Sequence, residues 1–373
     1  MKILRIVIGY FWVVGLLAIL AGPVPEAAGA GKTKLAIISS YHPDYLWEQD
    51  VQDGVCAGLA EFKFLLDPKD IARYRLRDAV DGPDTIIRHF WMDTKRKSRK
   101  ADILAQTAKI LPDLERFKPD LVILGDDNAA RYVGTQLLDG PIPVVFYGMD
   151  VTPLKYGLVD SLERPGHNVT GIYQTFYFRE ALLTLQKLAP SVKTFAILSD
   201  NSETGRAKSK IIQALSEQGQ FPMRLVRTVV TDSYAEWKSQ ALQAATLVDA
   251  FVVVNHNTLK EADGTPVDQL KAGAWYLRHV KKPECAGEKQ FAQEGLLLVV
   301  DDSGYKQGYE AVKMASQILR ERRDPAAMPP RAPERGKIIV NRKRAAALGI
   351  DLDGKDFIEE TLNRSLALDR YVR

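Results

Sequence analysis

The stretch "KLAIISSYHPDYLWEQD", residues 34–50, contains the unit from which the fold is built. Its first part is a short apolar run that ends at Ser39, which is typical of a strand buried on both faces of a sheet. A helical pattern of apolar residues follows from about Glu48 to Phe64. Polar and aromatic side chains lie between the two, a composition that suits a binding site and also the start of a helix.

The same alternation of strand and helix recurs along the chain. Further apolar runs occupy residues 120–125, 143–148, 194–200, 250–256 and 294–302. This order predicts parallel sheets with helices on both faces. A break rich in proline and glycine at residues 163–174 separates two such units, so the expected fold class is α/β with two doubly wound parallel-sheet lobes. A proline-rich linker at residues 324–336 leads to a last strand.

The start of the chain predicts export. Lys2 and Arg5 precede an apolar run at residues 6–20, and small residues follow up to Ala30. This is the pattern of a secretory signal peptide, residues 1–30, cleaved after Ala30, and it implies a periplasmic protein. The alternative is an uncleaved anchor helix, for which the run is short.

The net charge and the cysteines place few further limits on the function. The 373 residues carry a net charge of +4, which gives no reason to expect a nucleic-acid partner. Cys56 and Cys285 could form one disulfide, but their spacing leaves the pairing open. Neither cysteine has neighbours at the spacing of a metal site, so no metal or other cofactor is expected.

Short polar side chains follow the predicted strands. They form clusters at residues 39–41, 126–128, 149–150, 199–202, 255–258 and 301–303. Each cluster alone could be a set of helix N-caps. Ligands in open parallel sheets bind at the carboxyl ends of the strands, so clusters from two facing sheets would line one cleft. The basic run at residues 95–100 is interpreted as a solvated helix start.

Catalytic motifs are hard to find. The sequence has no G-x-S-x-G and no H-E-x-x-H pattern. His42 and His256 both follow strands and could act with Asp126 or Asp301 as acid and base, which leaves a hydrolase as the least favoured reading. The protein is therefore not expected to be an enzyme.

Several segments follow one another in a familiar order, among them "SYHPDYLW", "KPDLVILGDDNAA", "PVVFYGMDVTP", "ERPGHNVTGI", "VDAFVVVNHNT" and "DDSGYKQGYEAVKMASQIL". The order resembles the ABC transporter substrate-binding protein family, which uses the type I periplasmic binding protein fold. The resemblance implies two lobes joined by a three-crossover hinge, with the ligand held between them. It places lobe 1 at residues 31–171 plus 284–325 and lobe 2 at residues 172–283 plus 326–373.

The resemblance also implies site residues. Family positions in the loops after the strands match Ser40, Tyr41, Asp126, Asn128, Asn201, Glu203, Thr204 and Asp301. The strand-end rule and the aromatic residues beside the strands add Trp47, Tyr147, Tyr173 and Asn255. In this hypothesis Ser40 and backbone amides bind an acid group, Asp301 or Asp126 binds an amine, and Tyr41, Trp47 and Tyr173 cover the apolar part.

The expected function is capture of a small solute and its delivery to a membrane ABC permease. An amino acid or a similar zwitterion is the first expectation, because family members include binders of aromatic amino acids. The protein is expected to be a monomer. The alternative is a soluble sensing subunit for a membrane sensor kinase, because the first loop also resembles ligand domains of such kinases.

Overall fold

A computed structural model describes residues 31–371, and the predicted signal peptide lies outside this range. Lobe 1 is built on a six-stranded sheet in the order β2-β3-β1-β4-β5-β6. All neighbours are parallel except β2 and β3. The strands are β1 (Thr33–Ser39), β2 (Ala79–Asp81), β3 (Thr85–Trp91), β4 (Leu121–Gly125), β5 (Val144–Met149) and β6 (Val169–Tyr173).

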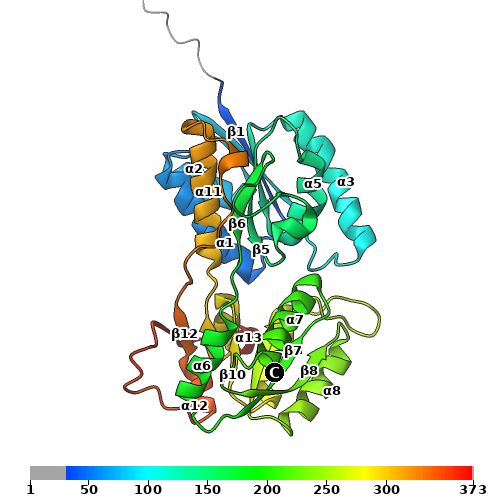
Figure 1. Ribbon diagram of the computed structural model, residues 1–373, viewed down its shortest axis with the longest axis vertical. Helices are drawn as coiled ribbons and strands as arrows, with labels where there is room; N and C mark the ends of the chain where they lie inside the picture. The colour runs from blue at the N-terminus through cyan, green and yellow to red at the C-terminus, as the bar shows by residue number, and fades with distance from the viewer. Residues whose placement is uncertain (1–30, 372–373) are drawn as a thin grey trace, which may run out of the picture.

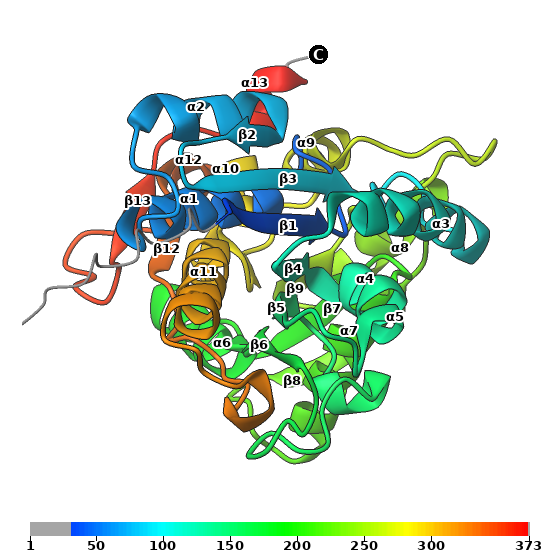
Figure 2. The same ribbon diagram turned by 90° about the horizontal axis from the view of Figure 1, so that it is seen from above.

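Helices cover both faces of this sheet (Figures 1 and 2). Alternate residues of β1 explain why: Leu35 and Ile37 pack toward α1 and α11, whereas Ala36 and Ile38 pack toward α3. Apolar side chains on both faces make a strand buried between two helical layers. The helices of this lobe are α1 (Leu46–Glu61), α2 (Pro68–Arg77), α3 (Lys100–Phe117), α4 (Asp126–Ala129), the π-helical turn η1 (Ala130–Gly134), α5 (Thr135–Leu137), the 3-10 turn η2 (Pro153–Tyr156) and α11 (Gly304–Arg320).

Lobe 2 is built on a seven-stranded sheet in the order β13-β12-β11-β10-β9-β7-β8, and only the β11–β12 pair is antiparallel. Its strands are β7 (Thr194–Ser199), β8 (Arg224–Val230), β9 (Ala250–Asn255), β10 (Glu284–Ala286), β11 (Leu298–Val300), β12 (Ile338–Asn341) and β13 (Glu360–Leu362). Its helices are α6 (Phe178–Leu188), α7 (Glu203–Glu217), α8 (Tyr234–Ala245), α9 (Gln269–His279), α10 (Lys289–Glu294), α12 (Arg342–Ala347) and α13 (Leu366–Arg370).

The expected lobe boundary at residue 284 is wrong. β10 pairs with β9 and β11 pairs with β10, so residues 284–300 belong to the second sheet. The break at Pro283 is an ordinary helix-to-strand turn inside lobe 2, not a crossing between lobes. The chain returns to lobe 1 only after Val300. It stays there through the short 3-10 turn η3 (Pro325–Ala327), because Met328 is buried in the lobe 1 core.

Three crossovers join the lobes, as expected (Figure 1). The first follows β6, the second runs from β11 to α11, and the third leads into β12. The second and third lie side by side, because the Asp301 N–H donates to Lys337 O at 3.0 Å and the Gly336 N–H donates to Asp301 O at 2.7 Å. This pairing lets the two strands of the hinge move together.

The structure also shows the state of the two cysteines and the character of the helices. Cys56 is buried in lobe 1 and Cys285 in lobe 2, and both are free thiols. Over residues 31–371 no helix combines the length and the apolar character needed to cross a membrane.

Candidate ligand-binding site

The carboxyl ends of the two sheets face each other across a cleft, and a polar cavity lies between them. Lobe 1 lines it with residues that follow β1, β3, β4 and β5, and lobe 2 lines it with the end of β9, the segment after β10 and the first two turns of α7. The lining residues are Tyr41, Tyr45, Trp47, Lys95, Asp126 and Asp150 from lobe 1, Gln174 from the first crossover, and Thr204, Lys208, Val254, Asn255, Glu288 and Gln290 from lobe 2.

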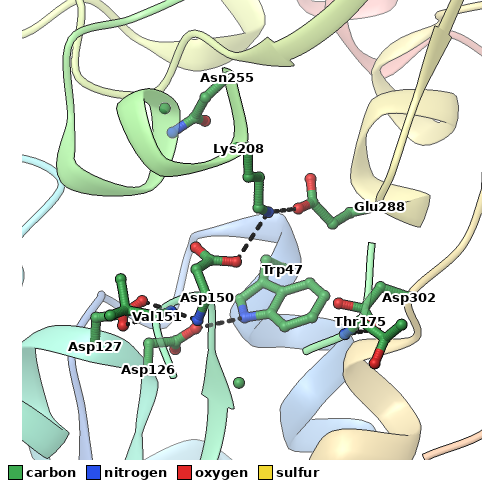
Figure 3. A network of polar contacts seen from close by, with 12 residues as sticks. Trp47, Asp126, Asp127, Asp150, Val151, Thr175, Lys208, Asn255, Glu288 and Asp302 are labelled. Atoms are coloured by element: carbon green, nitrogen blue, oxygen red, sulfur yellow. Dashed lines mark hydrogen bonds and ion pairs between the residues drawn. The ribbon is translucent and has the colours of Figure 1, made fainter. Parts of the chain in front are cut away.

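Asp126 is a buried carboxylate aimed at this cavity. Its Oδ1 accepts a hydrogen bond of 3.1 Å from the Trp47 indole N–H, whereas its Oδ2 is buried with no hydrogen-bond partner (Figure 3). Its backbone has a φ of 63°, a conformation that costs energy in a residue other than glycine and clusters at functional sites. Burial, followed by the nearby Glu48 and Asp150, raises the pKa of Asp126.

Lys95 is a buried cation in the same cavity. The residue is only 7% exposed, and its Nζ lies 4.2 Å from the ring centre of Tyr41 and 5.0 Å from that of Tyr45. These cation–π contacts are its closest interactions, since its ammonium donates to no acceptor and forms no ion pair within the described residues. Burial lowers the pKa of Lys95, and Asp200 and Asp126 oppose this shift.

Lys208 connects the two lobes. Its Nζ lies 3.1 Å from Asp150 of lobe 1 and also contacts Glu288 of lobe 2, and the side chain is only 4% exposed (Figure 3). Burial disfavours the charge, but Asp150 and Glu288 outweigh this effect and raise the pKa of Lys208. The ammonium is therefore charged and holds the lobes together.

Other contacts support this closed arrangement. The Asn257 side-chain amide of lobe 2 donates to the Tyr45 hydroxyl of lobe 1 at 2.6 Å, and Gln290 donates to the same hydroxyl at 3.1 Å. The free cavity volume is only about 10 Å³, which is room for about one water molecule. Entry of a larger ligand therefore requires the lobes to part or Lys208 and Gln290 to shift.

The predicted site residues fall into three groups. Five of them line this cavity: Tyr41, Trp47, Asp126, Thr204 and Asn255. Three line an adjoining chamber at the side of the cleft: Asn128, Asn201 and Glu203. The remaining four lie outside both spaces: Ser40, Tyr147, Tyr173 and Asp301.

The four outside residues have structural partners instead. The Ser40 hydroxyl donates to Gly125 O at 2.6 Å and accepts from the Ala129 N–H at 2.8 Å, so it fastens the loop after β4. Tyr147 is fully buried, and its hydroxyl donates to Glu48.

The other two residues of that group lie near the crossovers. Tyr173 ends β6, and its carbonyl accepts from Gln307 at 3.3 Å. Asp301 accepts the Lys289 N–H at 2.9 Å beside the hinge, and burial raises its pKa to about 7.

Sequence reasoning named Asp150 only as part of a polar cluster after a strand, and it gave no site role to the cavity residues Tyr45, Lys95, Gln174, Lys208, Val254, Glu288 and Gln290. Lys95 was assigned to a solvated basic run, yet it follows β3 and the strand-end rule applies to it as well. Lys208 lies four residues after Thr204 on α7, and this spacing places both on one face of the helix. Glu288 and Gln290 follow β10, a strand of three residues that was assigned to the other lobe.

The two histidines do not form the acid–base pairs considered above. His256 is buried in lobe 2, and its Nε2 lies 2.8 Å from Glu294. His42 lies at the other side of the cleft, with its Nδ1 4.0 Å from Asp44. Neither histidine forms a hydrogen bond or an ion pair with Asp126 or Asp301.

Two α/β lobes that close on a polar cavity, joined by three crossovers, define a class: the two-lobed solute-binding proteins. The chain belongs to the ABC transporter substrate binding protein family, whose model matches residues 86–358. No curated protein sequence matches the chain significantly.

Solved structures share the fold at low sequence identity. The "ABC domain in complex with L-Trp" from Streptococcus pneumonia has a TM-score of 0.66 and 19% identity, covering 89% of this chain and 100% of its own. A ligand-free, open substrate binding protein with adhesive properties from Clostridium difficile has a TM-score of 0.61 and 20% identity, covering 88% and 98%. A solute binding protein from Bacillus halodurans with bound myo-inositol has a TM-score of 0.52 and 13% identity, covering 86% and 99%.

Proposed function

We propose that the protein is an exported, non-catalytic receptor that traps a small zwitterion between its lobes and delivers it to a membrane ABC permease. Membership of the substrate-binding family implies a small-molecule ligand and a permease partner. The choice of a zwitterion rests on one observation: the cavity holds the ammonium of Lys95, a residue only 7% exposed that has no hydrogen-bond acceptor or ion pair in the described part of the chain, and a buried oxygen of Asp126 without a donor.

The free energy of burying charged groups favours such a ligand. Burying a charge without a partner is unfavourable by several kcal/mol. A ligand with an acid group beside Lys95 and an ammonium beside Asp126 would compensate both charges in the closed form. The closed form would then gain contacts that the open form lacks, which is all that ligand-induced closure requires. In this proposal Lys95 binds the acid group, the role that the sequence hypothesis gave to Ser40. Asp126 binds the amine.

The rings of Tyr41, Tyr45 and Trp47 complete the proposal. All three line the cavity on the lobe 1 side, and Tyr41 and Tyr45 stack edge to face with ring centres 5.0 Å apart. Such rings provide apolar contact area with fixed orientation. The L-Trp named for the Streptococcus structure is one example of a zwitterion bound by this fold, whereas myo-inositol is not a zwitterion.

A thermal-shift screen tests the class of ligand. Three matched sets would be compared with the purified mature protein: amino acids, the corresponding amines without the carboxylate, and the corresponding acids without the amine. We expect the melting temperature to rise only with members of the first set. An equal rise with amines alone, or a rise with neutral polyols and none with amino acids, would contradict the proposal.

A further inference from the structure

A chamber of about 300 Å³ adjoins the ligand cavity at the side of the cleft. Tyr41, Lys95 and Thr204 line both spaces, so the two lie next to each other. The chamber has far more room than the cavity itself. A part of the ligand that extends from the cavity past Thr204 would have space here.

Cations surround this chamber from both lobes. Lys95, Lys100 and Arg131 come from lobe 1, and Arg206 and Lys260 come from lobe 2. Arg131 pairs with Glu203 at 3.3 Å, and Arg206 donates to the side chain and the carbonyl of Asn201. Within the described part of the chain, the ammonium groups of Lys100 and Lys260 have neither a hydrogen bond nor an ion pair.

The carboxylates of the chamber are engaged elsewhere. Asp127 accepts the backbone N–H groups of Asp150 at 3.0 Å and Val151 at 3.1 Å, as Figure 3 shows. Asp232 accepts from the Asn201 N–H and the Thr258 hydroxyl. Glu203 is held by Arg131. Five cations therefore line the chamber with three carboxylates that already have partners. The chamber can accept additional negative charge.

Two long helices begin at the chamber. α3 starts at Lys100 without a side-chain cap from Arg99, whereas α7 starts at Glu203 and the Ser202 hydroxyl accepts from the Gly205 N–H. The first N–H groups of a helix have no partners inside it and carry partial positive charge. Lys95 lines this chamber as well as the cavity, so its ammonium adds to the positive charge shared by the two spaces.

We propose that the chamber is an anion subsite of the ligand site, which binds a second acidic group, a carboxylate or a phosphate, at the far end of the ligand. This proposal rests on the proposed function, because it describes the part of the same ligand that leaves the cavity. The ligand would then be an amine with two acidic groups rather than a neutral or aromatic amino acid. Lys100 and Lys260 lie on opposite lobes, so the distal anion would also favour closure.

Inorganic phosphate and acetate serve as probes, titrated by calorimetry at constant ionic strength into the wild-type mature protein. Lys95, Lys100 and Arg131 share lobe 1, so half of the subsite remains assembled even when the lobes part. We compare the double variant Lys100→Met/Lys260→Met with Lys69→Met/Lys109→Met, which removes the same charge from exposed positions outside the chamber.

We expect the wild type and the control variant to bind phosphate with equal affinity, and the chamber variant to bind about tenfold more weakly or worse. Stronger binding of phosphate than acetate would favour a phosphorylated ligand, and the reverse order a dicarboxylic one. No binding to the wild type, or equal binding to both double variants, would overturn the subsite. Asp126→Asn separates the two proposals, since it should abolish zwitterion binding and leave phosphate binding unchanged.

Discussion

At the scale of single residues, Lys95 is the most informative side chain. A buried ammonium without an acceptor is unfavourable in the unliganded protein and becomes favourable when a ligand supplies an acid group. Lys95→Met should therefore raise the stability of the unliganded protein by about 1 kcal/mol or more. It should also weaken ligand binding by about 2–5 kcal/mol, at least roughly thirtyfold in Kd.

Chemical denaturation and calorimetry measure these two effects separately. Lys97→Met is the matched control, because this lysine lies in the same loop, is 44% exposed and only pairs with Asp93. Loss of stability together with loss of binding in Lys95→Met would show that Lys95 has a structural role and does not anchor the ligand.

Glu48 is a second residue with a measurable signature. It is fully buried in lobe 1, where Ser39 and Tyr147 donate to it, and burial raises its pKa to about 7. The folded state therefore holds a proton that the unfolded chain releases near pH 4.3. Protonated Glu48 makes its full contribution to the free energy of unfolding below about pH 4. This contribution is lost as the pH rises to about 7.

Glu48→Gln should flatten this part of the stability curve, by up to roughly 3 kcal/mol between the two limits. Glutamine keeps an acceptor for Ser39 and cannot titrate. The measurement is the free energy of unfolding of both proteins between pH 4 and pH 8. An unchanged slope in the variant would assign the pH dependence to other carboxylates.

At the scale of secondary-structure elements, the close packing of α1 against α11 positions the loop that carries Tyr41 and Tyr45. Gly54 of α1 makes this approach possible, because a Cβ there would collide with the backbone carbonyl of Tyr305. The colliding atom belongs to the backbone and cannot move aside as a flexible side chain would. Close approach of backbones is a common reason for glycine inside a helix.

Gly54→Ala should destabilise the protein by about 1–3 kcal/mol, although alanine favours helix more than glycine does. Ala60→Val, at an exposed position of the same helix, is the control, with an expected cost below about 1 kcal/mol. Urea denaturation measures both. A stabilised Gly54→Ala variant would mean that the two helices are less tightly packed than described.

The elements also show how far sequence reasoning reaches. Long apolar strands such as β1, β4 and β9 predicted the two sheets, because burial on both faces leaves a clear pattern. The three-residue strand β10 leaves almost none, so its lobe was assigned wrongly.

Site residues could be predicted where the sequence around them has a clear pattern. The strand-end rule and the family pattern both indicated Asp126, and the family pattern alone indicated Thr204. Lys95 was assigned to a basic run whose other members are mostly exposed.

At the scale of the whole molecule, Lys208 holds the lobes closed through Asp150 and Glu288. Lys208→Met would leave both carboxylates buried without a cation in the closed form, which is strongly unfavourable. The variant should therefore be more open in solution, with a larger radius of gyration by small-angle X-ray scattering. Lys210→Met, at an exposed position of the same helix, should match the wild type. Equal radii for all three proteins would show that other contacts control closure.

Native mass spectrometry of the protein as purified reports directly on whether Lys95 and Asp126 together hold a small zwitterion. We predict one bound molecule of small mass that carries an amine and an acid group and disappears after unfolding and refolding. It should be absent from the double variant Lys95→Met/Asp126→Asn. An adduct that persists in that variant, or one that lacks either group, would show that Lys95 and Asp126 do not bind a zwitterion together.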